Sequence, residues 1–203
     1  MHPPKVVVFD LGKVLVDFDY SQAARRIAAR SSTAPERVQQ FIDHSPLLAR
    51  YESGQLTTPE FFQEVCRATG FAGSLSEFSE YFADIFTEMP ETIALHARLR
   101  GDGIPVYLFS NSNDLAISHI RRRFPFFAQF DDYIISYERG ALKPHAPIYE
   151  AVERAALCTG ADIAYLDDRP ENVAAGAARG WRTVLHQSAS QTTQALRSWG
   201  LRC

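Results

Sequence analysis

The 203-residue sequence predicts an α/β fold, a doubly wound parallel sheet with an α-helical bundle inserted after its first strand. Two observations carry this prediction. From Met89 onward, short apolar runs alternate with segments of helical periodicity, which is typical of a parallel sheet covered by helices. Between the first apolar run and Met89, the segments have helical spacing. We therefore expect an α/β core made of residues 1–15 and 89–203 and a helical cap spanning residues 16–88.

The strands of the core are predicted at residues 6–9, 104–111, 133–138, 163–168 and 182–186, and its helices at 91–103, 114–124, 146–158 and 171–180. The first strand, VVVF, is a continuous apolar run, as expected for a parallel strand covered on both faces. Open α/β sheets bind ligands at the carboxyl ends of their strands. The residues that follow each strand are therefore the first candidates for a functional site.

The inserted segment predicts helices at residues 20–32, 34–54, 57–70 and 74–86. Each begins near a Ser, Thr or Pro residue, and two end at a Gly, which are common helix start and stop signals. Aromatic residues recur there at roughly helical spacing, namely Phe61, Phe62, Phe78, Tyr81, Phe82 and Phe86. We expect them to form the core of a small bundle.

Composition argues against several classes of protein. The net charge of −3 and the pI near 6.1 are not those of a dedicated nucleic-acid binder, which would be strongly basic. No apolar run approaches the ~20 residues of a membrane span, and the N-terminal residues show no signal peptide. The three cysteines lack metal or redox spacing and are expected to be free thiols. We expect a cytoplasmic monomer or weak homodimer with no nucleic-acid or membrane partner.

Polar residues follow the predicted strands in an ordered way. They supply three carboxylates, a hydroxyl, an amide and an ammonium, and they are Asp10, Ser110, Asn111, Lys143, Asp167 and Asp168. Taken singly, each has an ordinary explanation as a helix cap, a turn residue or a solvated charge. Because the carboxyl ends of parallel strands share one edge of the sheet, we expect these side chains to form a single site.

This combination of groups predicts phosphate chemistry. Carboxylates held close together repel one another, and a hard divalent cation such as Mg²⁺, which prefers oxygen ligands, relieves the repulsion. An ammonium, a hydroxyl and backbone N–H groups at a helix start suit a phosphate dianion. An aspartate beside both, here Asp10, is placed as a nucleophile.

The same residues resemble the motifs of the haloacid dehalogenase (HAD) superfamily of phosphohydrolases. In chain order, VVVFDLGKVL, YLFSNS, LKP and YLDDRPEN are similar to its four motifs, with a helical cap between the first two. The resemblance covers essentially the whole chain and implies a HAD-like, Rossmannoid core. With the cap string YESGQLTTPEF, it is closest to sugar-phosphate phosphatases of the α-D-glucose-1-phosphate phosphatase type. It implies a Mg²⁺-dependent phosphatase whose substrate is a small phosphomonoester such as a sugar phosphate.

The resemblance also implies which residues act on the phosphoryl group. Asp10 and Lys143 are the expected catalytic residues, with Asp10 as the nucleophile that forms an aspartyl-phosphate. Ser110, Asn111 and Lys143 are expected to hold the transferring phosphoryl group.

The implied Mg²⁺ site contains Asp10, Asp168 and the backbone carbonyl of Gly12. Asp167 is expected at the same site, where it and Asn172 orient water and neighbouring groups.

Gly12 departs from the family pattern, because most phosphatases of the superfamily have a second Asp there as general acid and base. Without a positioned acid, hydrolysis with a poor leaving group would lose about 10² to 10⁴ in rate. Lys13 and Glu52 are the candidate substitutes. The cap residues expected to face the leaving group come from the segment HSPLLARYESG and are His44, Arg50, Tyr51 and Glu52.

Two alternatives remain open. A 2-haloacid dehalogenase would use Asp10 to attack carbon, and such relatives also lack the second Asp, but they need no metal and would leave Asp167 and Asp168 unexplained. A non-catalytic phosphate-binding module would explain Gly12 but not the intact Asp10. A serine hydrolase is disfavoured, because Ser110 has no glycine-flanked elbow.

Overall fold

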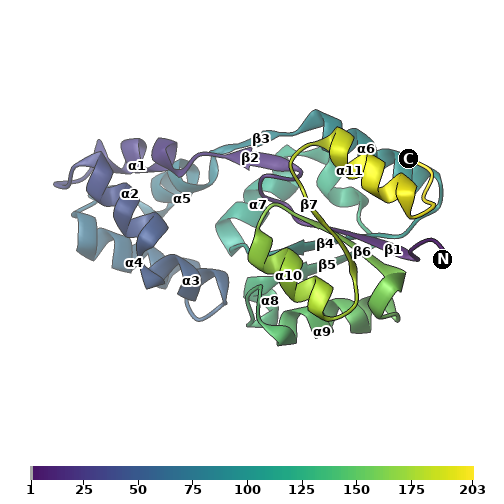
Figure 1. The fold of residues 1–203 in the computed structure, drawn as a ribbon. Coiled ribbons are helices and arrows are strands. Elements are labelled where there is room, and N and C mark those ends of the chain that lie inside the picture. Colours follow the sequence, from purple (N-terminus) through teal and green to yellow (C-terminus); the bar gives the residue numbers. More distant parts are fainter. Residues whose placement is uncertain (1) are drawn as a thin grey trace.

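The computed structural model describes residues 2–203, apart from the side chains of residues 43 and 44. The chain forms an α/β core and a separate lobe of helices, which two short strands connect (Figure 1). In residues 2–203 no helix is both long enough and apolar enough to cross a membrane.

The core contains a five-stranded parallel sheet with the strand order β5-β4-β1-β6-β7. Its strands are β1 (Val6–Phe9), β4 (Val106–Ser110), β5 (Asp132–Ile135), β6 (Ile163–Asp167) and β7 (Arg182–Leu185). The first strand in the sequence is therefore the central strand of the sheet. The predicted fold class, a parallel sheet flanked by helices, is confirmed.

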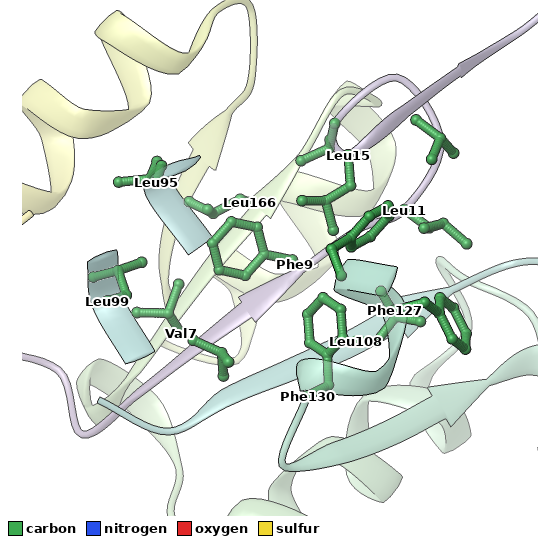
Figure 2. Packing of buried hydrophobic residues seen from close by; sticks show 14 of the residues in the cluster. Val7, Phe9, Leu11, Leu15, Leu95, Leu99, Leu108, Phe127, Phe130 and Leu166 are labelled. Carbon is green, nitrogen blue, oxygen red and sulfur yellow. The ribbon is translucent and has the colours of Figure 1, made fainter. Parts of the chain in front are cut away.

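Helices cover both faces of the sheet, as the apolar run in β1 predicts. Val7 and Phe9 point into one hydrophobic core, which Figure 2 shows together with Leu95 and Leu99 of α6 (Pro90–Gly101). The same core is completed by α7 (Asp114–Arg123) and α11 (Ala189–Ser198). The intervening Val6 and Val8 point into a second core on the opposite face, against α9 (Ala146–Ala156) and α10 (Pro170–Ala178).

The cap has a hydrophobic core of its own. Its helices are α1 (Tyr20–Ala28), α2 (Pro35–His44), α3 (Pro46–Glu52), α4 (Thr58–Thr69) and α5 (Leu75–Ala83). Phe61, Phe78 and Phe82 are fully buried between them, as the aromatic pattern predicts. Phe62, Tyr81 and Phe86 are partly buried and pack against this core.

Two short strands form the neck between core and cap. β2 (Val16–Phe18) pairs antiparallel with β3 (Phe86–Glu88), so that Phe18 lies opposite Phe86. The N–H of Met89 donates to the carbonyl of Leu15 at 2.9 Å just beyond this pairing. The boundaries of 16 and 88 that we propose for the cap thus fall at the ends of the neck, which supports them.

The structure corrects the sequence prediction in the cap. The helix predicted at 34–54 is divided at Ser45, whose backbone is extended with ψ of 155° because a residue before proline avoids the α-helical conformation. The Ser45 hydroxyl instead accepts a hydrogen bond from the N–H of Leu47 and caps α3. The helix predicted at 74–86 ends at Ala83, since its last residue lies in β3.

The core also differs from the prediction at several points. The strand predicted at 133–138 ends at Ile135, and the chain then forms the short helix α8 (Ser136–Arg139), which Gly140 terminates with a φ of 65°. Helix α11 was not predicted, because its sequence ASQTTQALRS is largely polar. Two 3₁₀ turns, η1 (Pro125–Gln129) and η2 (Gly160–Asp162), complete the described chain.

Gly54 packs against the core at Tyr137 and gives a first prediction. It has a φ of +72°, and a Cβ atom on it would lie 2.4 Å from the carbonyl oxygen of Tyr137 in α8. Gly103 has a similar φ of +75° but nothing within 4 Å of its Cβ position, so it is the matched control. We expect Gly103→Ala to lower the free energy of unfolding by about 1 kcal/mol through its backbone conformation alone. Gly54→Ala should cost about 1–3 kcal/mol more, because the backbone must also move. Equal losses in urea denaturation would contradict this account of the contact.

Candidate active site

A cavity of about 230 Å³ lies at the carboxyl ends of β1, β4 and β6. The neck and the cap complete its walls. The predicted site residues that line it are Asp10, Gly12, Glu52, Ser110, Asn111, Lys143, Asp168 and Asn172. Asp167 is fully buried and does not line the cavity. One site thus contains nearly all the residues that the strand ends predict.

The Lys143 ammonium is the centre of this site. Its Nζ atom lies 2.9 Å from Asp10 Oδ1 and 2.7 Å from Asp167 Oδ2, and it donates to the Phe109 carbonyl at 2.9 Å. These contacts account for the three donors of an ammonium group. Only 1% of the Lys143 side chain is exposed, so the two ion pairs are buried. The geometry fixes the Asp10 carboxylate against a positive charge inside the cavity.

One ammonium between two buried carboxylates leaves the group with excess negative charge. Burial alone would lower the pKa of Lys143, but the two carboxylates raise it above its usual value. Burial raises the pKa of Asp10 to about 7, against the opposing effect of Lys143, and the neighbouring Asp167 adds to the increase. For Asp167, burial is outweighed by Lys143 and by further hydrogen bonds, which lower its pKa. Lys143 is therefore charged, and Asp167 is the carboxylate that it stabilises most.

The Asp167 carboxylate is saturated with protein donors. Besides Lys143, the hydroxyl of Tyr165 donates to Oδ2, and the N–H of Arg169 donates to Oδ1 at 2.8 Å. The Asn172 amide donates to both carboxylate oxygens, at 3.0 and 3.1 Å. These contacts hold Asp167 beneath the cavity as the group that positions Lys143.

Asp168 has a different environment. It lines the cavity, is half-buried, and makes no ion pair with any residue of the described chain. Burial, together with the nearby Asp167, raises the pKa of Asp168. Carboxylate oxygens of Asp10, Asp167 and Asp168 all lie within 4.8 Å of one another. An all-oxygen set with one compensating ammonium fits a hard cation such as Mg²⁺.

Asn111 positions the loop that carries Lys143. Its side-chain amide donates to the Lys143 carbonyl at 3.0 Å, and its Oδ1 accepts from the Lys143 N–H at 2.8 Å. Through these two hydrogen bonds the Asn111 side chain orients the lysine, and they use one of the two N–H donors of its amide. Ser110 also lines the cavity. Its hydroxyl donates to the Asn111 carbonyl at 3.3 Å.

The ring of Phe18 lies close to Gly12. Gly12 does not have a positive φ, but a Cβ atom on it would lie 2.8 Å from Phe18 Cε1. The next residue, Lys13, has a φ of 58°. Its ammonium binds Asp17 and the Phe18 carbonyl, so it is directed to the neck.

The cap residues predicted to face the leaving group have different environments. Glu52 lines the cavity, whereas Arg50 is exposed and Tyr51 is buried in the cap. The Tyr51 hydroxyl accepts a hydrogen bond from the N–H of Leu115 at the start of α7, so Tyr51 joins cap to core. The side chain of His44 lies outside the described residues.

Sequence reasoning missed the apolar wall of the cavity. This wall comes from the two strands of the neck and from helices α1 and α3 of the cap. Its larger members are Phe18, Tyr20, Leu48 and Phe86. Sequence reasoning assigned Phe86 to the bundle, where it does pack, but the β2–β3 pairing also brings it to the cavity. The alternation of Val16, Asp17 and Phe18, apolar, polar and apolar, was the available signal for the strand that enters the cap.

Comparison with known proteins identifies relatives across the whole chain. The haloacid dehalogenase-like hydrolase family matches residues 4–180. A D-ribitol-5-phosphate phosphatase of Bacteroides thetaiotaomicron is 23% identical over 199 residues, which cover 95% of this chain and 96% of that protein. The glucose-1-phosphate phosphatase type is not specifically supported by these relatives.

Solved structures establish the same fold. A HAD family enzyme of Bacteroides thetaiotaomicron, in complex with magnesium and inorganic phosphate, has a TM-score of 0.81 at 21% identity, over 91% of this chain and 94% of that one. The L-2-haloacid dehalogenase of Xanthobacter autotrophicus has a lower TM-score of 0.64 at 18% identity, over 98% of this chain and 85% of that one.

The Lys143 cluster generates a prediction about stability. Lys143→Met leaves Asp10 and Asp167 buried without their cation, which should lower the free energy of unfolding by about 3–5 kcal/mol at pH 8. Adding Asp167→Asn removes one of the two charges and should recover part of the loss. Without Lys143, the carboxylates in the folded state have pKa values above those of the unfolded chain, so the loss should shrink as pH falls. Urea denaturation at pH 8 and pH 5.5 tests both effects, and a double variant less stable than Lys143→Met would contradict them.

Proposed function

The chain belongs to the haloacid dehalogenase-like hydrolase family, and we propose that it is a Mg²⁺-dependent phosphatase that hydrolyses a small phosphomonoester through an aspartyl-phosphate on Asp10. The observation that carries the proposal is the buried ammonium of Lys143, 2.9 Å from Asp10 Oδ1 at the cavity. It orients the carboxylate and supplies positive charge where a phosphoryl group would arrive.

The first step is attack of an Asp10 carboxylate oxygen on phosphorus. A bond forms between that oxygen and phosphorus while the bond from phosphorus to the alcohol oxygen breaks. Water then attacks the phosphorus of the aspartyl-phosphate, and the products are inorganic phosphate and the original carboxylate. The Lys143 ammonium places its positive charge beside the phosphoryl group in both steps, while Asn111 and Asp167 hold it in place.

Mg²⁺ would be held by Asp10, Asp168 and the Gly12 carbonyl, and the Mg²⁺ complex of the structural relative supports this assignment. The ion supplies charge compensation for the phosphate and for the clustered carboxylates. The saturated hydrogen bonding of Asp167 favours a role in positioning Lys143.

The other end of the cavity favours a small carbohydrate-like alcohol as the leaving group. Phe18, Tyr20 and Phe86 provide an apolar surface, while Glu52 and Arg169 provide polar groups for hydroxyls. The relative that acts on D-ribitol 5-phosphate supports a sugar or sugar-alcohol phosphate.

The dehalogenase alternative is less well supported. The likeness to the haloacid dehalogenase bears on the fold alone. Attack on carbon needs no metal ion, so it would not explain why Asp168 lies beside Asp10 and Asp167. A binding module, in turn, would not need a carboxylate held ready by a buried ammonium.

A substrate panel tests the proposed function. The purified chain is assayed with p-nitrophenyl phosphate, D-ribitol 5-phosphate and glucose 1-phosphate, with Mg²⁺ and after EDTA treatment, alongside 2-chloropropionate. We expect phosphate release that EDTA abolishes and Mg²⁺ restores, because the carboxylate cluster needs a cation. Chloride release that is insensitive to EDTA would establish the dehalogenase, and binding of phosphate esters without turnover would establish the binding module.

Covalent catalysis predicts the behaviour of Asp10→Asn. This variant should retain less than about a thousandth of the wild-type rate, because an amide is not a nucleophile for phosphorus. Beryllium fluoride, which mimics the phosphoaspartate, should inhibit the wild type. Asp102→Asn, at an exposed aspartate beyond α6, is the control and should keep the full rate. A larger residual rate for a folded Asp10→Asn protein would exclude the aspartyl-phosphate.

A further inference from the structure

The departing alcohol needs a proton, and no residue in the described loop after β1 is placed to donate it. When Asp10 displaces an alkoxide from phosphorus, the alkoxide oxygen requires a proton, and a positioned acid speeds this step by about 10² to 10⁴. The loop after β1 offers no acid at residue 12, which is a glycine whose Cβ position would lie 2.8 Å from Phe18 Cε1. The proton must come from elsewhere in the cavity.

Most charged groups of the cavity are committed to other partners. Asp10 is bound by Lys143, whose own ammonium is held by two carboxylates and a carbonyl. Lys13 binds Asp17 and the Phe18 carbonyl. The guanidinium of Arg169 pairs with Glu171 and does not lose its proton in the physiological range.

Among the described residues, two carboxylates that line the cavity have no such partner, Asp168 and Glu52. Asp168 is assigned to Mg²⁺ in the proposed function, which leaves Glu52. Its carboxylate lines the cavity and makes no hydrogen bond or ion pair with any residue of the described chain. Burial raises its pKa to about 7, against the opposing charges of Arg169 and Lys143. At neutral pH a substantial fraction of Glu52 therefore carries a proton in a cavity that contains the nucleophile.

Direct contacts between cap and core fix the backbone around Glu52. The hydroxyl of Ser136, in α8 of the core, donates to the Glu52 carbonyl at 2.6 Å. The preceding residue, Tyr51, accepts from the N–H of Leu115 at 3.2 Å and bonds to Thr58 at 2.7 Å. The end of α3 is thus held against the rim of the sheet, and this docking places the glutamate over the active site.

We propose that Glu52 is the general acid and base of the reaction, supplied by the cap. As the bond from phosphorus to the alcohol oxygen breaks, the Glu52 carboxyl gives its proton to that oxygen, and the alcohol leaves neutral. The resulting carboxylate then takes a proton from the water that attacks the aspartyl-phosphate. Inorganic phosphate leaves, and Asp10 and protonated Glu52 are regenerated. This inference rests on the proposed function.

The experiment compares Glu52→Gln with wild type on two esters that differ in leaving group. p-Nitrophenyl phosphate leaves as a stable anion and needs no acid, whereas D-ribitol 5-phosphate leaves as an alkoxide that does. We expect Glu52→Gln to lower kcat/KM by about 10²-fold or more for ribitol phosphate and by less than about tenfold for the aryl ester. Because kcat/KM reports the first irreversible step, slow release of phosphate from the enzyme does not disguise the difference.

The pH profile provides a readout that a structural role would not move. With ribitol phosphate, wild-type kcat/KM should fall as pH rises above about 7, where Glu52 loses its proton. This alkaline limb should be absent with the aryl ester and absent in Glu52→Gln. Glu36→Gln, at an exposed glutamate in the first turn of α2, is the control and should behave as wild type. The unfolding midpoint of each variant checks that it is folded.

Three results would overturn the inference. Equal losses on both esters would make Glu52 a residue that only positions the cap or the substrate. A loss selective for ribitol phosphate in Tyr20→Phe, but not in Glu52→Gln, would assign the proton to the phenol of Tyr20, which also lines the cavity. Wild-type turnover of neither ester would remove the proposed function and this inference with it, whereas wild-type turnover with equal losses removes the inference alone.

Discussion

The active site depends on one buried ammonium. Lys143 reaches Asp10 at the end of β1, the Phe109 carbonyl in β4 and Asp167 at the end of β6. These strands are neighbours in the sheet, so a single charge joins their carboxyl ends at the cavity. Burying a lysine and two aspartates is costly, and the arrangement is stable only because donors and acceptors are matched throughout. The hydrogen bonds from Asn111, Asn172 and Tyr165 supply that matching.

Much of this arrangement follows from local sequence signals. Apolar runs located the five core strands, and the polar residues at their ends include five that line the cavity, namely Asp10, Ser110, Asn111, Lys143 and Asp168. The sequence could not reveal contacts between distant segments. The hydrogen bond from the Ser136 hydroxyl to the Glu52 carbonyl, for example, joins core and cap and exists only once the cap is docked. The same reason applies to Asp167, which lies in the carboxylate cluster and is also bound by the ammonium of Lys143 from a distant loop.

The two lobes divide the work of the proposed reaction. The core holds the nucleophile and the phosphoryl group with residues that are fixed by the sheet. The cap and neck supply the apolar residues of the cavity wall together with Glu52, and these are the groups that would meet the leaving group. An acid carried by the cap would link proton transfer to cap docking, because Ser136 and Leu115 in the core fix the segment that carries it. The leaving alcohol would then receive its proton from a residue whose position depends on contacts between cap and core.

The neck also has a consequence for how the chain folds. β1 pairs with β4, yet the entire cap lies between these strands in the sequence, with Val7 opposite Val106. Closing so long a loop costs conformational entropy before the sheet gains any contacts. A cap that forms its own hydrophobic core presents β2 and β3 side by side, as the Phe18–Phe86 pairing holds them. With the two ends of the cap held together, the remaining loop between β1 and β4 is short. The cap then costs β1 and β4 little more on pairing than a short connection would.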